Sequence, residues 1–267
     1  MTKRLVQVAP LIEEMRRLGA DLLLWRTDTE ASHIHAKAEL KTEADRRAHL
    51  RLKAALNKLD AGVPIISEED AVHESNRPLR YWLIDPIDGT ASWLEGFDGF
   101  VSQVALMEGS EPVLGLVYAP ALDLFYMAAK GEGAWLNGRR MPELGRREGL
   151  TMIDNTPEPR GLCASLFAHM SATGYVESGS LGLKLCRIAD GTADLFVKDV
   201  VVRDWDLAPA KVLLDELGGM LTDLDAVPYR FSGAWEKASG FIAARDPATV
   251  LSCVSAIDAL GGKAKEC

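Results

Sequence analysis

The sequence predicts a layered fold of the α/β (α+β) class, and three observations lead to this prediction. Apolar residues recur at helical spacing across much of residues 5–59. Short apolar or β-branched runs, separated by Gly, Pro, Asp and Asn, follow across residues 63–128. After a polar segment, helical patterns return and alternate with short strands. Helices and strands that each bury one face stack as layers, so this order favours helices packed on sheets.

Two helices are expected first. Apolar residues from Leu5 to Leu22 follow helical spacing, and Pro10 should mark a start or a kink there. A second helical pattern runs from Ala44 to Leu59. Thr42 precedes it and belongs to a residue type that caps helix N-termini, and Gly62 should follow its end.

Five strands are expected next, each bounded by turn-forming residues. They are predicted over residues 63–66, 81–84, 101–107, 113–118 and 124–128.

Residues 137–160 are polar and hold three prolines and three glycines, so we place a boundary there. We predict an N-terminal α+β subdomain over residues 1–145 and a C-terminal α/β subdomain over residues 146–267, joined in one compact catalytic unit. In the second part, helices are expected over 181–188, 207–217 and 248–260, and strands over 195–197, 219–221 and 240–243.

Composition is that of an ordinary globular chain: 267 residues, 48% hydrophobic and 26% charged. The 30 Lys and Arg against 39 Asp and Glu leave a formal net charge of −9, so a nucleic-acid polymer is not the expected partner. No apolar run approaches the roughly 18 residues that a membrane span needs. Glutamates also interrupt the N-terminal stretch that a secretory signal would keep apolar. We therefore expect a cytoplasmic protein with no membrane partner.

The segment from Asp85 to Thr90, DPIDGT, carries the strongest sign of chemistry. Its proline fixes φ and its glycine permits a tight turn, so the carboxylates of Asp85 and Asp88 can point at one place. Hard oxygen ligands at this spacing suit Mg²⁺. Turns are rich in Asp, Pro and Gly in any protein, but this turn directly follows an apolar strand, which favours the metal interpretation.

Three other acidic positions have plain interpretations when taken alone. Asp206 could cap the helix that follows it, the Glu68–Glu69 pair could be solvated loop charge, and Asp45 with Thr42 could be a helix start. Their occurrence together with DPIDGT favours a shared site.

These residues resemble the inositol monophosphatase superfamily of metal-dependent, lithium-sensitive phosphatases, with the motifs in the family's order and the similarity spanning nearly the whole chain. The matching segments are KTEAD (41–45), SEED (67–70), WLIDPIDGT (82–90), VLGLVYAPALDLFYMAAKGEGAWLNG (113–138) and WDLAPAKVLLDELGG (205–219). The resemblance implies an αβαβα sandwich that hydrolyses a small phosphorylated metabolite. Members are commonly homodimers.

The resemblance also implies a ligand set for two Mg²⁺ ions. Glu68, Asp85 and the backbone carbonyl of Ile87 would hold the first, and Asp85, Asp88 and Asp206 would hold the second.

Further roles follow from the same resemblance. Asp45 and Thr90 would be paired by a hydrogen bond and would orient and deprotonate a metal-bound water. Gly89 and Thr90 would offer backbone N–H groups to the phosphate, while Glu69 would support the metal ligands or help to place a third metal. No Ser, Cys or His nucleophile is required, and the five histidines lie outside these motifs.

The substrate is open between branches of this family. Lys184 and Lys198 resemble basic positions of the 3′(2′),5′-bisphosphate nucleotidases, where they would neutralise a second phosphate. Asp199 instead stands where inositol monophosphatases bind inositol hydroxyls. The nucleotidase alignment needs no gap and the inositol alignment needs one insertion, so we prefer the nucleotidase. Histidinol-phosphatase and fructose-1,6-bisphosphatase branches share the metal motifs, and a non-catalytic metal-binding module is the remaining alternative.

Overall fold

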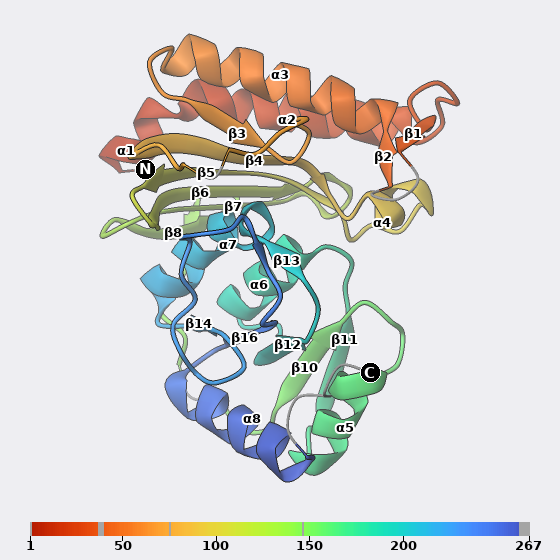
Figure 1. Cartoon of the computed structure of the whole chain (residues 1–267), viewed down its shortest axis with the longest axis vertical. Coiled ribbons are helices and arrows are strands. Elements are labelled where there is room, and N and C mark those ends of the chain that lie inside the picture. Colours follow the sequence, from red (N-terminus) through yellow and green to blue (C-terminus); the bar gives the residue numbers. More distant parts are fainter. Residues whose placement is uncertain (1, 37–39, 75, 146, 262–267) are drawn as a thin grey trace.

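The protein is stacked in five layers, helices and sheets alternating, as Figure 1 shows for a computed structural model of the chain. The structure describes residues 2–36, 40–74, 76–145 and 147–261. From top to bottom the layers are α2 with α3, a seven-stranded sheet, α6 with α7, a five-stranded sheet, and α5 with α8. This arrangement confirms the predicted αβαβα fold.

The outer helical layer comprises α1 (Lys3–Gln7), α2 (Ala9–Trp25) and α3 (Glu43–Leu59). Pro10 lies in the first turn of α2, where its missing N–H leaves no helical bond unmade. Thr42 caps α3 in a capping box with Asp45, and the short strands β1 (Ile34–Ala36) and β2 (Lys41–Thr42) pair just before that cap. The start of α3 is thereby fixed.

The seven-stranded sheet has its strands in chain order, with β3 and β4 parallel and the other neighbours antiparallel. Its strands are β3 (Ile65–Ser67), β4 (Arg80–Asp88), β5 (Val101–Glu108), β6 (Glu111–Ala119), β7 (Leu124–Ala129), β8 (Gly133–Leu136) and β9 (Arg139–Arg140), with a 3₁₀ turn at Pro120–Leu122. Along β4, Tyr81 and Leu83 face the core shared with the middle helices, whereas Trp82 and Ile84 face the core under α2 and α3. Both faces are therefore apolar, and this explains the continuous apolar run in its sequence.

The middle layer consists of α6 (Leu181–Ala189) and α7 (Asp204–Leu217). A Cβ added at Gly115 on β6 would lie 1.9 Å from the carbonyl oxygen of Pro209, so only glycine permits this approach of α7 to the sheet. The N-termini of both helices lie near the edge of the sheet where β4 ends, beside the short helix α4 (Thr90–Leu94).

The five-stranded sheet has the order β11–β10–β12–β16–β14 and is covered by α5 (Gly161–His169) and α8 (Pro247–Ala259). Its strands are β10 (Thr151–Asp154), β11 (Gly174–Glu177), β12 (Leu195–Lys198), β14 (Met220–Thr222) and β16 (Phe241–Ala244). A separate ribbon pairs β13 (Val202–Arg203) with β15 (Glu236–Lys237). Within the described ranges, none of the helices combines the length and the apolar character that crossing a membrane requires.

Among the features that differ from expectation are helix α5 and strand β11, which the sequence does not predict, and two more. The sequence predicts no strand within residues 137–160, yet β9 and β10 lie there, because neighbouring strands bury even the polar ends of β10 at Thr151 and Asp154. Helix α7 begins at Asp204, two residues before Asp206, so Asp206 is not its N-cap but a first-turn residue. The division into two subdomains stays a prediction.

Candidate active site

The predicted site residues gather at one edge of the seven-stranded sheet. Strands β3 and β4 are parallel, so both end at this edge, and the backbone N–H of Glu68 bonds to the carbonyl of Ile84 at 3.2 Å. This pairing places Glu68 beside Asp85. We call Glu68, Asp85, Asp88 and Asp206 the acidic cluster.

Asp85 occupies the centre of the acidic cluster and is 1% exposed. The carboxyl of Glu68 is its neighbour, because β3 and β4 pair up to Ser67 and Ile84. The buried amide of Gln103 on β5 approaches Asp85 Oδ2 at 3.4 Å and Asp88 Oδ2 at 3.2 Å. The other oxygen, Asp85 Oδ1, is buried without a hydrogen-bond partner. Such an atom costs free energy unless something binds it.

Asp88 is held by the N-terminus of α6. Its carboxylate accepts from the backbone N–H groups of Leu181 at 3.3 Å and Gly182 at 2.7 Å. Next to it, Gly89 has φ +90°, and a Cβ added there would lie 3.2 Å from Ser180 Cβ. The positive φ favours glycine at this position, and a Cβ would also crowd Ser180.

Asp206 joins the cluster from the first turn of α7. Its Oδ2 accepts from the backbone N–H of Arg203 at 2.8 Å, and the amide of Gln103 lies 3.4 Å from its carbonyl oxygen. The turn that starts α7 thus fixes this side chain.

Burial and mutual repulsion shift the titration of the cluster. Burial raises the pKa of Asp85 well above its ordinary value, and the neighbouring carboxylates raise it further. Burial and the charges of Asp88 and Glu68 raise the pKa of Asp206 in the same way. Burial also raises the pKa of Asp88 and of Glu68, but for Asp88 the bonds from α6 oppose the rise. A bound cation would relieve this unfavourable charge.

The donor set fits a divalent cation with oxygen ligands. Carboxylates are the protein ligands that Mg²⁺ prefers, and Asp85 Oδ1 is a free buried acceptor in their midst. In the part of the chain that the structure describes, no three His, Cys, Asp or Glu side chains are arranged to hold a metal ion as they stand. The carboxylates meet in pairs, Glu68 with Asp85 and Asp85 with Asp88 through Gln103.

Asp45 and Thr90 face each other beside the cluster. Asp45 Oδ2 accepts from the backbone N–H and the hydroxyl of Thr42 at 2.7 and 2.6 Å, whereas Oδ1 lies 3.2 Å from Thr90 Oγ1. Thr90 Oγ1 also lies 3.1 Å from the carbonyl oxygen of Ile87. Burial raises the pKa of Asp45, against the bonds from Thr42 and Thr90. This carboxylate can therefore receive a proton passed through Thr90.

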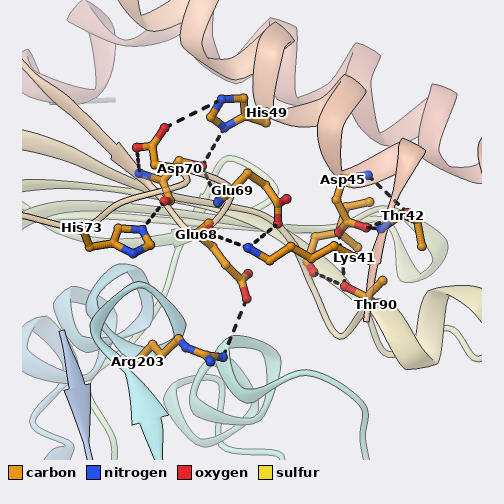
Figure 2. A network of polar contacts seen from close by, with 12 residues as sticks. Lys41, Thr42, Asp45, His49, Glu68, Glu69, Asp70, His73, Thr90 and Arg203 are labelled. Carbon is orange, nitrogen blue, oxygen red and sulfur yellow. Dashed lines mark hydrogen bonds and ion pairs between the residues drawn. The ribbon is translucent and has the colours of Figure 1, made fainter. Parts of the chain in front are cut away.

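A cleft of about 920 Å³ opens beside Glu68 and Glu69, and Lys41, Arg203 and Trp205 also line it. Figure 2 shows Lys41 extending from the Thr42 end toward these glutamates. Its ammonium donates to the Glu68 carbonyl at 2.9 Å and lies 3.8 Å from Glu69 Oε1. From the opposite side, Arg203 approaches Glu68 Oε1 at 4.0 Å. Fixed cations thus flank the acidic cluster.

The residues predicted to choose the substrate lie elsewhere. Lys184 is fully buried, and its ammonium donates to the backbone carbonyls of Gly179 and Ser180. A substrate could reach it only if this turn moved. Lys198 pairs with Asp154 Oδ1 at 2.6 Å, and together with the exposed Asp199 they line a separate pocket of about 210 Å³.

Sequence reasoning does not single out Gln103, Lys41 or Arg203. Gln103 lies in an apolar strand, whose pattern indicates only which face of the sheet a side chain is on. Lys41 directly precedes Thr42, and the sequence pattern there indicates only a helix cap. Of the histidines, His49 lies 2.8 Å from Ser67 Oγ and His73 Nε2 lies 2.7 Å from the Ser67 carbonyl oxygen. Both brace the turn before Glu68, in agreement with a structural role.

The stabilising effect of Mg²⁺ should depend on pH. Carboxyl groups with a raised folded-state pKa give stability that is present at low pH and is lost as the pH rises through that pKa. Protons therefore compete with a metal for the cluster. We expect Mg²⁺ to raise the thermal midpoint, relative to EDTA, more at about pH 8 than at about pH 6. An equal or larger effect at the lower pH would contradict this assignment.

Comparisons with known proteins identify related sequences and structures. The sequence model of the inositol monophosphatase family matches residues 12–254. The 3′(2′),5′-bisphosphate nucleotidase CysQ of Escherichia coli (strain K12) is 31% identical over 231 residues, covering 82% of this chain and 92% of the relative. A protein of Aquifex aeolicus named fructose-1,6-bisphosphatase/inositol-1-monophosphatase is 30% identical over 187 residues, covering 67% and 70%. The solved structure of the Thermotoga maritima IMPase superposes with a TM-score of 0.77 at 26% identity, covering 94% of this chain and 97% of the other.

Proposed function

This chain belongs to the inositol monophosphatase family and is a phosphoric monoester hydrolase, and we propose that it uses Mg²⁺ at the acidic cluster to hydrolyse a small phosphorylated metabolite. This proposal depends on the acidic cluster, in which three neighbouring carboxylates act on the buried Asp85, whose Oδ1 has no partner. A group of like charges held this close is costly to a protein unless a cation offsets it.

We propose that Glu68, Asp85 and the Ile87 carbonyl hold one Mg²⁺ ion, and that Asp85, Asp88 and Asp206 hold a second. Bound Mg²⁺ supplies a lowered pKa for the attacking water and charge compensation for the phosphate oxygens. Glu69, held near Lys41, would support the ligands from the cleft side.

The chain's own residues would then move the proton and hold the phosphate. Thr90 Oγ1 would orient the attacking water, and Asp45 Oδ1 would take the proton through Thr90. The backbone N–H groups of Gly89 and Thr90 would face the phosphate. Phosphoryl transfer needs little more from side chains than positioning and charge stabilisation.

We further propose a 3′(2′),5′-bisphosphate nucleotide, such as 3′-phosphoadenosine 5′-phosphate, as the substrate class. The resemblance of Lys198 to a basic position of the nucleotidases supports this choice, although its ammonium is paired with Asp154 and lines a pocket separate from the cleft. The relative from E. coli carries a nucleotidase name. An inositol phosphate is the second candidate, because the carboxylate of Asp199 on the same pocket can accept bonds from sugar hydroxyls.

A panel of substrates tests this choice. Phosphate release with Mg²⁺ should be fastest on 3′-phosphoadenosine 5′-phosphate, compared with inositol 1-phosphate, histidinol phosphate and fructose 1,6-bisphosphate. Lys198→Met should lower kcat/KM on the nucleotide about ten- to a hundredfold, because a hydrogen bond to a charged group is lost. Lys130→Met, which removes an exposed lysine paired with Glu111, is the control and should change nothing.

The outcome separates the two candidates. If inositol 1-phosphate is preferred and Asp199→Asn, not Lys198→Met, lowers its kcat/KM, the nucleotidase assignment is wrong.

A further inference from the structure

A buried ion pair outside the proposed ligand set holds the start of α7, the helix that carries Asp206. Arg77 comes from the segment between β3 and β4, and its guanidinium reaches Asp204 Oδ2 at 2.5 Å. Asp204 is fully buried and the Arg77 side chain is 10% exposed. Asp204 is also the first residue of α7, two positions before Asp206.

Arg77 holds a second segment at the same time. Its guanidinium donates to the backbone carbonyls of Gly233 at 3.2 Å and Ala234 at 3.0 Å, and it lies 3.7 Å from the centre of the Trp235 ring. The Trp235 carbonyl in turn accepts from the backbone N–H of Asp204 at 3.0 Å. One guanidinium therefore joins the start of α7 to the segment that lines the cleft.

Other groups complete this arrangement. Tyr229 donates to Asp204 Oδ1 at 3.2 Å, and the ammonium of Lys237 lies 3.4 Å from the same carboxylate. The ring of Trp235 stacks near that of Trp205, with ring centres 6.2 Å apart. Asp204 thus keeps a cationic partner, Lys237, even if Arg77 is removed. A substitution of Arg77 should therefore displace the start of α7 more than it leaves the Asp204 charge uncompensated.

We propose that Arg77 is a positioning residue of the active site, which sets the place of Asp206 by clamping Asp204 and the 233–237 segment against the N-terminal sheet. The proposal rests on the proposed function of the acidic cluster. Helix α7 carries Asp206 in its first turn, so a small rotation of that turn moves the carboxylate away from Asp85 and Asp88. When a residue that orients a metal ligand without touching the metal is removed, metal affinity typically falls by about 10- to 100-fold.

A matched ion pair elsewhere in the chain separates positioning from stability. Arg245 pairs with Asp194 at 2.5 Å, with side chains 10% and 1% exposed, and also donates to a backbone carbonyl, that of Gly145. Asp194 precedes β12, at the opposite end of that strand from Lys198. Arg245→Met therefore removes an ion pair of the same distance and burial that contacts no residue of the acidic cluster.

The experiment compares Arg77→Met, Arg77→Lys and Arg245→Met with the wild type. Thermal midpoints are measured in EDTA, Mg²⁺ affinity by calorimetry, and kcat and KM on the best substrate of the panel. Both methionine variants should lose similar stability. Arg77→Met alone should weaken Mg²⁺ binding, by about tenfold or more, and lower kcat more than it raises KM. Arg77→Lys keeps the positive charge but lacks the several N–H donors of the planar guanidinium. Its Mg²⁺ affinity should therefore lie between those of Arg77→Met and the wild type.

Equal Mg²⁺ affinities in Arg77→Met and Arg245→Met would overturn the proposal and leave Arg77 with a purely structural role. If Arg77→Met does not fold, Arg77→Lys against Arg245→Lys gives the same comparison, and equal affinities there would overturn it too. A wild type that binds Mg²⁺ but releases no phosphate would instead contradict the proposed function, because the binding comparison needs no turnover.

Discussion

Asp85→Asn is expected to lower turnover by about a thousandfold or more and to stabilise the metal-free protein at the same time. Asp85 is the carboxylate shared by both proposed Mg²⁺ positions, and removing even one preorganised electrostatic group costs about 10²–10³ in kcat. The amide has the shape of the carboxyl, and its oxygen can still accept from Gln103. It also removes a buried group whose ionisation is opposed by burial and by its acidic neighbours.

The measurement is phosphate release with Mg²⁺ together with the thermal midpoint in EDTA, which should rise by about 2–4 °C for each kcal/mol gained. Asp194→Asn is the matched control, because Asp194 is equally buried but is paired with Arg245. That variant should show the reverse pattern, with stability lost and turnover kept. A destabilised Asp85→Asn protein that keeps its turnover would contradict the cluster's assigned role.

Asp45→Asn is expected to lower kcat by about 10²–10⁴-fold, the usual contribution of a general base, with Mg²⁺ affinity unchanged. An amide at Asp45 cannot take a proton from Thr90 Oγ1, and Asp45 is not among the proposed metal ligands. The measurements are single-turnover phosphate release and Mg²⁺ binding by calorimetry.

Thr42→Val distinguishes this chemistry from helix capping. It removes the hydroxyl that caps α3 and bonds to Asp45 Oδ2, but it leaves Oδ1 facing Thr90. Stability should fall by about 1 kcal/mol, while kcat changes far less than in Asp45→Asn. Equal losses of kcat in the two variants would mean that Asp45 acts only through the helix start.

Local sequence patterns predict the parts of this site that a few neighbouring residues build. The Thr42 hydroxyl and Asp45, three residues apart, form hydrogen bonds with each other, so the start of α3 follows from the sequence alone. The turn that aims Asp85 and Asp88 is likewise local, because proline and glycine restrict it. That Glu68 lies beside Asp85 depends on the parallel pairing of β3 with β4, which no local pattern reveals. The family resemblance implies only that the two residues share a metal ion.

Other features of the site depend on contacts between segments that the fold brings together. The direction of the Lys184 ammonium follows from the carbonyls of Gly179 and Ser180, which the turn before α6 presents to it. Asp206 resembles an N-cap in sequence, but pairing of Arg203 in β13 with Glu236 in β15 lets α7 start earlier. Gln103 and Arg77 act across long sequence separations, and periodicity says nothing about such partners.

The net charge of −9 first argues only against a nucleic-acid partner. Four of the acidic residues behind this charge lie in the acidic cluster, where burial and mutual repulsion make the carboxylates unfavourable without a bound cation. With cations bound, the same residues can accept a phosphate that they would otherwise repel.

Phosphate release on the substrate panel, measured as Mg²⁺ is titrated into EDTA-treated enzyme, tests whether the protein hydrolyses phosphate esters through a bound metal ion. We expect no release without metal, saturable activation by Mg²⁺, and the fastest release from 3′-phosphoadenosine 5′-phosphate. Release that is undiminished in EDTA, or no release from any of the four esters at saturating Mg²⁺, would contradict this expectation.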